Sequence, residues 1–184
     1  MSSAGKNDIS QEIIEGCMDS DERCQKLVYE TLYQTMYAIC LRYSNNSDEA
    51  KDLLQDGFMK LFKKIKKYKG DANFTVWVKR LFINHSIDYV RSAYKKYVYY
   101  VDEVYSEESE DPFQEEEDPE ETTKEKVFEA MNRLRADYRL ILNLYAVENL
   151  SHIEIADKLG MQETSSRSKL SRARVALKKE MKRV

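Results

Sequence analysis

Glycine and proline are scarce in this chain of 184 residues, which has five and two copies respectively. Sheet-rich sandwiches and barrels need both residues at their many turns, so this scarcity favours an all-helical fold. No apolar run approaches the roughly 18 residues of a membrane-spanning helix, and the N-terminus lacks the basic and then apolar pattern of a signal peptide. We therefore expect no membrane insertion.

Histidine and cysteine are also rare. His85 and His152 lie far apart and neither is next to a cysteine, so metal ligation is not expected. Three cysteines argue against a disulfide scaffold in a chain of this size, which favours a cytoplasmic location. The sequence contains no phosphate-binding loop, dinucleotide fingerprint or nucleophile elbow. We expect no catalytic residues, no cofactor and no metal.

Charge is strongly segregated although the formal net charge is only −3. Residues 51–100 carry twelve basic and four acidic side chains, and residues 162–184 carry eight and two. Between them, residues 101–121 hold twelve acidic side chains, no basic one, and both prolines. Like charges extend such a segment, so it predicts a flexible acidic linker between two polyanion-binding domains. Solvated helix faces around an acidic loop are the alternative.

Apolar residues recur with helical periodicity on both sides of the acidic segment. Helices are predicted upstream over about 9–18, 21–43, 47 to a stop near Gly70, and 75–96, with Ser47 as a cap. Downstream, they are predicted over about 123–135, 137–149, 151–159 and 162–182. The expected fold is all-α with a four-helix domain (1–96), an acidic linker (97–122) and a C-terminal helix-turn-helix domain (123–184).

The helix-turn-helix prediction depends on the segment that begins at Ser151. Ser151 and Glu154 form a capping box, Gly160 ends the first helix, and a short turn precedes the second. The first helix should bury Ile153 and the second should bury Leu170, Ala173, Leu177 and Met181. The second helix carries a basic outer face that fits the major groove of DNA. An ordinary solvated helix pair is the alternative.

Two polar patterns mark the upstream domain. Asp52, Gln55 and Asp56 share one helix face, where adjacent carboxylates can accept bidentate bonds from a partner's arginines. Pairing with Lys51 and Lys60 in the same helix is the alternative. A second helix carries a polar stripe that suits unstacked bases and consists of Trp77, Arg80, Asn84, Asp88 and Arg91. Here the alternative is that Trp77 is half-buried core.

Three segments resemble bacterial sigma factors, especially the two-domain extracytoplasmic-function (ECF) class. The run NLYAVENLSHIEIADKLGMQETSSRSKLSRARVALKK is similar to their C-terminal DNA-binding domain. The runs DEAKDLLQDGFMKLFKKI and FTVWVKRLFINHSIDYVRS resemble their polymerase-binding and promoter-melting helices. The resemblance covers about residues 9–182, in the family's order. Ser166 stands at a usually apolar position, and Gly57 is expected to cost its helix about 1 kcal/mol relative to alanine.

The resemblance implies a sigma factor that binds core RNA polymerase and directs promoter recognition and transcription initiation without catalysis of its own. Its implied partners are core polymerase, promoter DNA and an anti-sigma factor. The implied polymerase-binding residues are Asp52, Gln55, Asp56 and Phe58. The implied contacts to the −10 promoter element are Trp77, Arg80, Asn84 and Arg91. The implied contacts to the −35 element are Arg167, Ser168 and Ser171 at base edges, and Lys169, Arg172 and Arg174 near phosphates.

Two rival functions remain open at the level of sequence. The first is a helix-turn-helix regulator that binds DNA without polymerase, which a symmetric homodimer on a palindromic site would favour. The second is an enzyme with an unrecognised site, such as a helical nuclease. The acidic linker also has three alternatives. They are a segment that threads a basic polymerase channel, a mask over the basic faces of the free protein, and a solubilising spacer.

Overall fold

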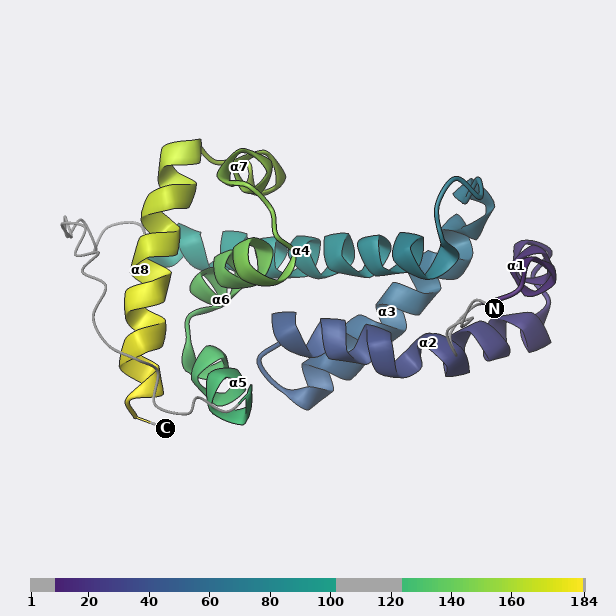
Figure 1. Ribbon diagram of the computed structural model, residues 1–184, viewed down its shortest axis with the longest axis horizontal. Helices are drawn as coiled ribbons and strands as arrows, with labels where there is room; N and C mark the ends of the chain where they lie inside the picture. Colours follow the sequence, from purple (N-terminus) through teal and green to yellow (C-terminus); the bar gives the residue numbers. More distant parts are fainter. Residues whose placement is uncertain (1–8, 102–123, 184) are drawn as a thin grey trace, which may run out of the picture. The chain divides into compact units, whose positions relative to one another are not determined.

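The computed structural model describes residues 9–101 and 124–183, with the backbone alone for residues 93–101 and 124. Within these ranges it contains helices and turns but no strand, which confirms the all-α prediction (Figure 1). The upstream elements are α1 (Gln11–Met18), α2 (Glu22–Tyr43), α3 (Ser47–Lys64), the 3-10 turn η1 (Ile65–Lys67) and α4 (Phe74–Val101). The downstream elements are α5 (Lys124–Arg133), α6 (Ala136–Leu142), the π-helical turn η2 (Asn143–Val147), α7 (His152–Leu159) and α8 (Glu163–Met181).

The chain forms two compact units, Met1–Tyr89 and Val90–Val184. Helix α4 begins in the first unit and runs through residues 97–101, which the sequence pattern had placed in the linker. The rest of the predicted linker, including the acidic run from residue 102 onward, lies outside the described residues. In the parts that the structure describes, no helix is both long and apolar enough to cross a bilayer.

The core of the first unit is built from apolar stripes on its helices. Helices α2 and α3 lie side by side, and α1 packs on α2 (Figure 1). Helix α4 joins α3 through the Phe58 and Phe82 rings, whose centroids are 5.2 Å apart. The largest contributors to this core are Val28, Leu32, Met36, Leu54, Leu61, Ile65, Val78 and Phe82, all at most 2% exposed.

The beginning and end of α3 differ from the sequence prediction. Asn46, not Ser47, caps the helix, and its Oδ1 accepts hydrogen bonds from the amides of Asp48 (3.1 Å) and Glu49 (2.8 Å). Asn46 has extended backbone angles, so the helix already begins at Ser47. The end also comes earlier than expected, because η1 follows Lys64 and Gly70 (φ +79°) lies in the next turn.

In the second unit, α5, α6 and α7 each pack against α8. Their buried residues include Ala130, Leu134, Ile141, Leu144, Ile155, Leu170 and Ala173. The prediction that Ile153 is buried is wrong, because its side chain is 66% exposed. Two helical steps place Ile153 about 200° around α7 from the buried Ile155, on the opposite face.

Candidate functional site

Helices α7 and α8 form the predicted helix-turn-helix. Ser151 Oγ accepts from the Glu154 amide (3.3 Å), and Glu154 accepts from the Ser151 amide (2.8 Å), which confirms the capping box. The hydrogen bonds that the Glu154 carboxylate accepts from the Ser151 amide and from the Ser151 hydroxyl (2.8 Å) lower its pKa. Gly160 then adopts left-handed angles (φ 66°, ψ 41°), a conformation that costs glycine little. The turn therefore leads directly into α8, the candidate recognition helix.

A polar contact beneath the motif ties α7 to α8. His152 Nδ1 lies 3.0 Å from Ser166 Oγ, and Ser166 is fully buried. The His152 ring also stacks on Tyr145, with a centroid distance of 5.1 Å. Burial and then the charge of Arg167 lower the pKa of His152. Ser166 therefore occupies a usually apolar position because a histidine hydrogen-bonds to it, which the sequence pattern did not reveal.

The outer face of α8 carries most of the predicted DNA contacts. Arg167, Ser168, Arg172 and Arg174 are exposed, and Ser171 is half-buried. Arg167 forms an ion pair with Glu163 (2.6 Å) one turn earlier, and the Arg174 guanidinium lies over the Tyr145 ring (5.2 Å). Both contacts hold guanidinium groups close to the helix surface, where they remain accessible to a phosphate or a base edge.

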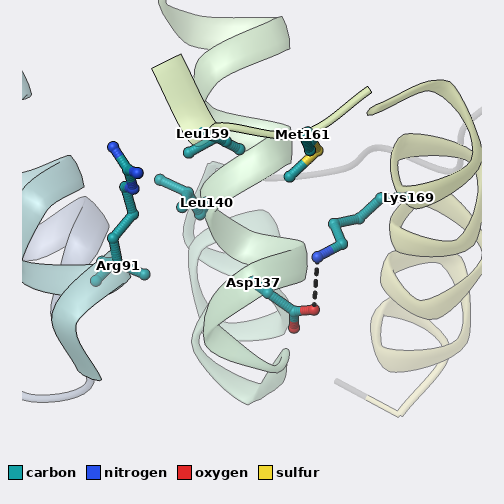
Figure 2. A pocket seen from close by; sticks show the side chains of 7 residues that line it. Arg91, Asp137, Leu140, Leu159, Met161 and Lys169 are labelled. Carbon is teal, nitrogen blue, oxygen red and sulfur yellow. Dashed lines mark ion pairs between the residues drawn. The ribbon is translucent and has the colours of Figure 1, made fainter. Parts of the chain in front are cut away.

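Lys169 departs from its predicted position near DNA phosphates. Its ammonium group pairs with the buried carboxylate of Asp137 on α6 (3.4 Å), and its side chain is only 19% exposed (Figure 2). Asp137 also pairs with Arg135 (3.2 Å). Lys169 lies at the edge of the buried stripe that contains Ser166, Leu170 and Ala173, so the carboxylate draws it inward. We therefore correct its assignment, because this ion pair attaches the recognition helix to α6.

The polar stripe on α4 is only partly a surface feature. Arg80 and Asn84 are exposed, whereas Trp77 is half-buried. The Trp77 ring packs against Tyr68 (5.4 Å between centroids) and Phe74 (6.0 Å). Trp77, Arg80 and Asn84 follow one another along one face of α4. Arg91 belongs to the second unit, where its guanidinium donates a hydrogen bond to the Lys158 carbonyl oxygen (2.9 Å).

The carboxylate face of α3 lies open to solvent. Asp52, Gln55 and Asp56 are all exposed. The two lysines that were the alternative partners bind elsewhere, because Lys51 pairs with Asp48 (3.0 Å) and Lys60 contacts His85 (2.7 Å). Within the described residues, neither Asp52 nor Asp56 forms an ion pair. Their charges are therefore available to a partner.

Phe58 was predicted to bind polymerase together with these residues, and the structure places it beneath their face. Its side chain is 3% exposed and packs on Phe82 of α4 and on Tyr29 of α2, 4.6 Å between ring centroids. Phe58 lies two residues beyond Asp56 and so points about 200° around the helix, toward the core. It contributes the floor beneath the binding face rather than a free side chain.

A shallow apolar groove between α2 and α3 lies next to the carboxylates. It is lined by Tyr29, Tyr33, Leu54, Gln55, Met59 and Phe62, with Phe58 at its floor. Met59 is 50% exposed and Tyr29 39%, so both present apolar area to solvent beside the groove. The sequence pattern did not reveal this groove, although tyrosines at 29, 33 and 37 recur at one helical spacing, and in the structure their rings adjoin one another.

Two family models match this chain on either side of the acidic segment. The model for sigma-70 region 2 matches residues 28–96, and that for sigma-70 region 4 matches residues 124–177. The chain belongs to the sigma-70 family. The carboxylate face, the groove and the start of α4 all lie in its region 2, and the helix-turn-helix lies in its region 4.

Similarity to known proteins narrows this sigma factor to the ECF class. It is 27% identical over 161 residues to the ECF RNA polymerase sigma factor SigW of Bacillus subtilis, covering 80% of this chain and 83% of the relative. It is 26% identical over 175 residues to the ECF RNA polymerase sigma-E factor of Escherichia coli K12, covering 91% of both.

Among solved structures, the sigma factor RpoE of Bartonella quintana in complex with the anti-sigma factor NepR has a similar fold. Its TM-score is 0.52 at 24% identity, and the match covers 85% of this chain and 96% of that one.

Proposed function

We propose that this sigma factor binds core RNA polymerase through the carboxylate face of α3 and guides it to promoters through α4 and α8. Residues 1–96 form the polymerase-binding and −10 domain, residues 97–122 the linker, and residues 123–184 the −35 domain. The polymerase supplies the catalysis, so the sigma factor needs no reactive group. It acts in the cytoplasm, where the polymerase transcribes.

The observation that carries the proposal is the pair of unpaired, exposed carboxylates beside an apolar groove. Asp52 and Asp56 present two negative charges one turn apart, with Gln55 between them as a further hydrogen-bonding group. Met59 and Tyr29 supply adjacent apolar area. A partner helix that carries arginines and apolar side chains would satisfy both features at once.

The second unit supports the DNA-binding half of the proposal. The outer face of α8 offers Arg167 and Ser168 for base edges, with Ser171 beside them, and Arg172 and Arg174 for phosphates. Arginine binds guanine edges with two hydrogen bonds, and phosphate contacts set the register. We assign the −10 element to Arg80 and Asn84 with the exposed edge of Trp77, and leave Arg91 out of this set because it bonds to Lys158.

Transcription in vitro tests the function directly. Core polymerase supplemented with this protein should transcribe from promoters that core polymerase alone ignores. Changing Asp52 and Asp56 together to Asn should weaken polymerase binding about tenfold, because two charge-assisted contacts are lost. The matched control is Glu12→Gln with Asp71→Asn, which removes two exposed charges away from the α3 face.

The same experiment distinguishes the proposed function from that of a helix-turn-helix regulator that works without polymerase. A regulator that works without polymerase would bind DNA but leave transcription by core polymerase unchanged. Polymerase affinity that is equal in the wild type and the Asp52/Asp56 variant would contradict the carboxylate assignment. We also propose an anti-sigma factor as a regulatory partner, supported by the complex in which the Bartonella quintana relative was solved.

A further inference from the structure

Lys60 and His85 make a contact whose chemistry is constrained. The Lys60 Nζ atom on α3 lies 2.7 Å from His85 Nδ1 on α4. An ammonium group has only hydrogens to donate, so Nδ1 must be the acceptor and His85 must be neutral. His85 is 9% exposed, and among the described residues its buried Nε2 has no hydrogen-bond partner. Among the described residues, the polar contact that the ring makes is therefore the one with the Lys60 ammonium.

Helix geometry offers Lys60 a different partner. Asp56 precedes it by four residues, and an acidic residue followed by a lysine at this spacing pairs readily on a helix surface. Nevertheless, the described residues contain no ion pair between Asp56 and Lys60. The ammonium is directed to α4 instead, although Asp56 is close enough for its charge to act on His85.

The charges around His85 act on its pKa in opposite directions, and burial decides the net direction. Lys60 and Lys64 on α3 face it with positive charge, and Asp56 and Asp88 face it with negative charge. Burial and then the Lys60 charge lower the pKa of His85. The ring is thus neutral at physiological pH and keeps its acceptor nitrogen.

We propose that His85 is a positioning residue for polymerase binding, because it holds the Lys60 ammonium on α4 and so keeps the Asp56 carboxylate free for a cation of the polymerase. The inference rests on the proposed function of the α3 face. It assigns a role to a buried α4 residue that does not itself touch the partner.

A double-mutant cycle with full-length protein and core polymerase tests the proposal. His85→Leu should release Lys60 to pair with Asp56 and weaken polymerase binding about threefold at low salt, an effect that screening reduces at high salt. Lys60→Met alone should bind at least as well as the wild type. The double variant should return to the affinity of Lys60→Met. His85→Gln keeps an acceptor oxygen and should behave like the wild type.

The matched control adds Lys66→Met to His85→Leu. Lys66 is exposed and lies ten positions beyond Asp56 in η1, about 15 Å away along the helical rise, so Lys66→Met should not restore binding. Melting temperatures identify variants whose weaker binding results from unfolding. If His85→Leu does not fold, His85→Met, with an unbranched apolar side chain, takes its place in the cycle.

The outcomes separate the inference from the function on which it rests. Absence of polymerase binding by the wild type would refute the proposed function itself. If the wild type binds, two results overturn the role of His85. One is unchanged affinity in the His85→Leu variant, and the other is a loss that Lys60→Met fails to restore, which would mean that His85 only stabilises the fold. Restoration by Lys60→Met but not by Lys66→Met supports the proposal.

Discussion

Gly57 shows how one residue sets the distance between two helices. Helix propensity alone predicts that alanine would improve this position by about 1 kcal/mol. In the structure, however, a Cβ at Gly57 would overlap the Phe82 ring, reaching 2.8 Å from both Cδ1 and Cζ. Glycine is therefore needed because α4 packs its phenylalanine directly on the α3 backbone.

We expect Gly57→Ala to destabilise the protein by about 1–3 kcal/mol, because the Phe82 ring or the helix must shift to admit a methyl group. Denaturant unfolding followed by circular dichroism measures this change. Gln34→Ala at an exposed position of α2 is the control and should stay within about 0.5 kcal/mol of the wild type. A more stable Gly57→Ala protein would show that propensity outweighs packing here.

The two histidines predict how stability depends on pH. Burial lowers the pKa of both His85 and His152 below the ordinary value of 6.5. Below about pH 6.5 the unfolded chain therefore binds more protons than the folded chain, and stability falls as the pH falls toward the lowered pKa values.

The melting temperature should accordingly be lower at pH 5.5 than at pH 7.5. His85→Gln and His152→Gln should each reduce this difference, because each removes one group whose pKa changes on folding. As a control, the melting temperatures at pH 7.5 and pH 8.5 should differ less, because both histidines are neutral over this range. A melting temperature that rises on acidification would contradict the directions of both pKa shifts.

At the scale of elements, α8 has an inward and an outward set of basic residues. Lys169 pairs with the buried Asp137 on α6, whereas Arg172 is exposed. Side chains on the two faces thus have different roles. The inward lysine fixes the recognition helix, and the outward arginine is available to DNA.

Lys169→Met should reduce the stability of the folded chain by about 1–3 kcal/mol, because it removes one partner of a buried carboxylate that Arg135 still satisfies. Arg172→Met should leave stability nearly unchanged and weaken DNA binding with a shallower salt dependence. Thermal unfolding and DNA titration at several salt concentrations measure both. A Lys169→Met protein that keeps its stability but binds DNA with a shallower salt dependence would show that Lys169 contacts DNA phosphates instead.

At the scale of the whole molecule, the chain separates two binding tasks between two units. The carboxylate face belongs to the first unit and the basic face of α8 to the second. Neither surface shares residues with the other, so their substitutions should act independently.

We expect Asp52→Asn with Asp56→Asn to weaken polymerase binding without changing the affinity of the isolated protein for −35 DNA. Arg167→Ala with Arg172→Ala should weaken DNA binding by about 1–3 kcal/mol for the lost base contact of Arg167, with a further loss for the phosphate contact of Arg172, and leave polymerase binding intact. Combining all four should give the sum of the two effects on promoter-complex formation. Arg133→Ala, an exposed charge on α5, serves as the control for the arginine variant. Strong non-additivity would show that the surfaces are coupled.

Sequence alone determined the features that depend on neighbours along the chain. Helical periodicity predicted the helices, the Ser151–Glu154 spacing predicted the capping box, and the helical spacing of Arg167 and Arg174 placed both on the outer face of their helix. These features follow from the 3.6-residue repeat and from backbone hydrogen bonds within one or two turns, which local sequence specifies.

Only the tertiary structure decided the residues at the boundary between buried and exposed faces. Lys169 turned toward Asp137, because packing partners from other helices determine which side chains near the edge of a stripe are covered. The contacts of Lys60 with His85 and of His152 with Ser166 join residues that lie 25 and 14 positions apart. Helix periodicity assigns each residue a direction, but the partner it meets there depends on how the helices pack together.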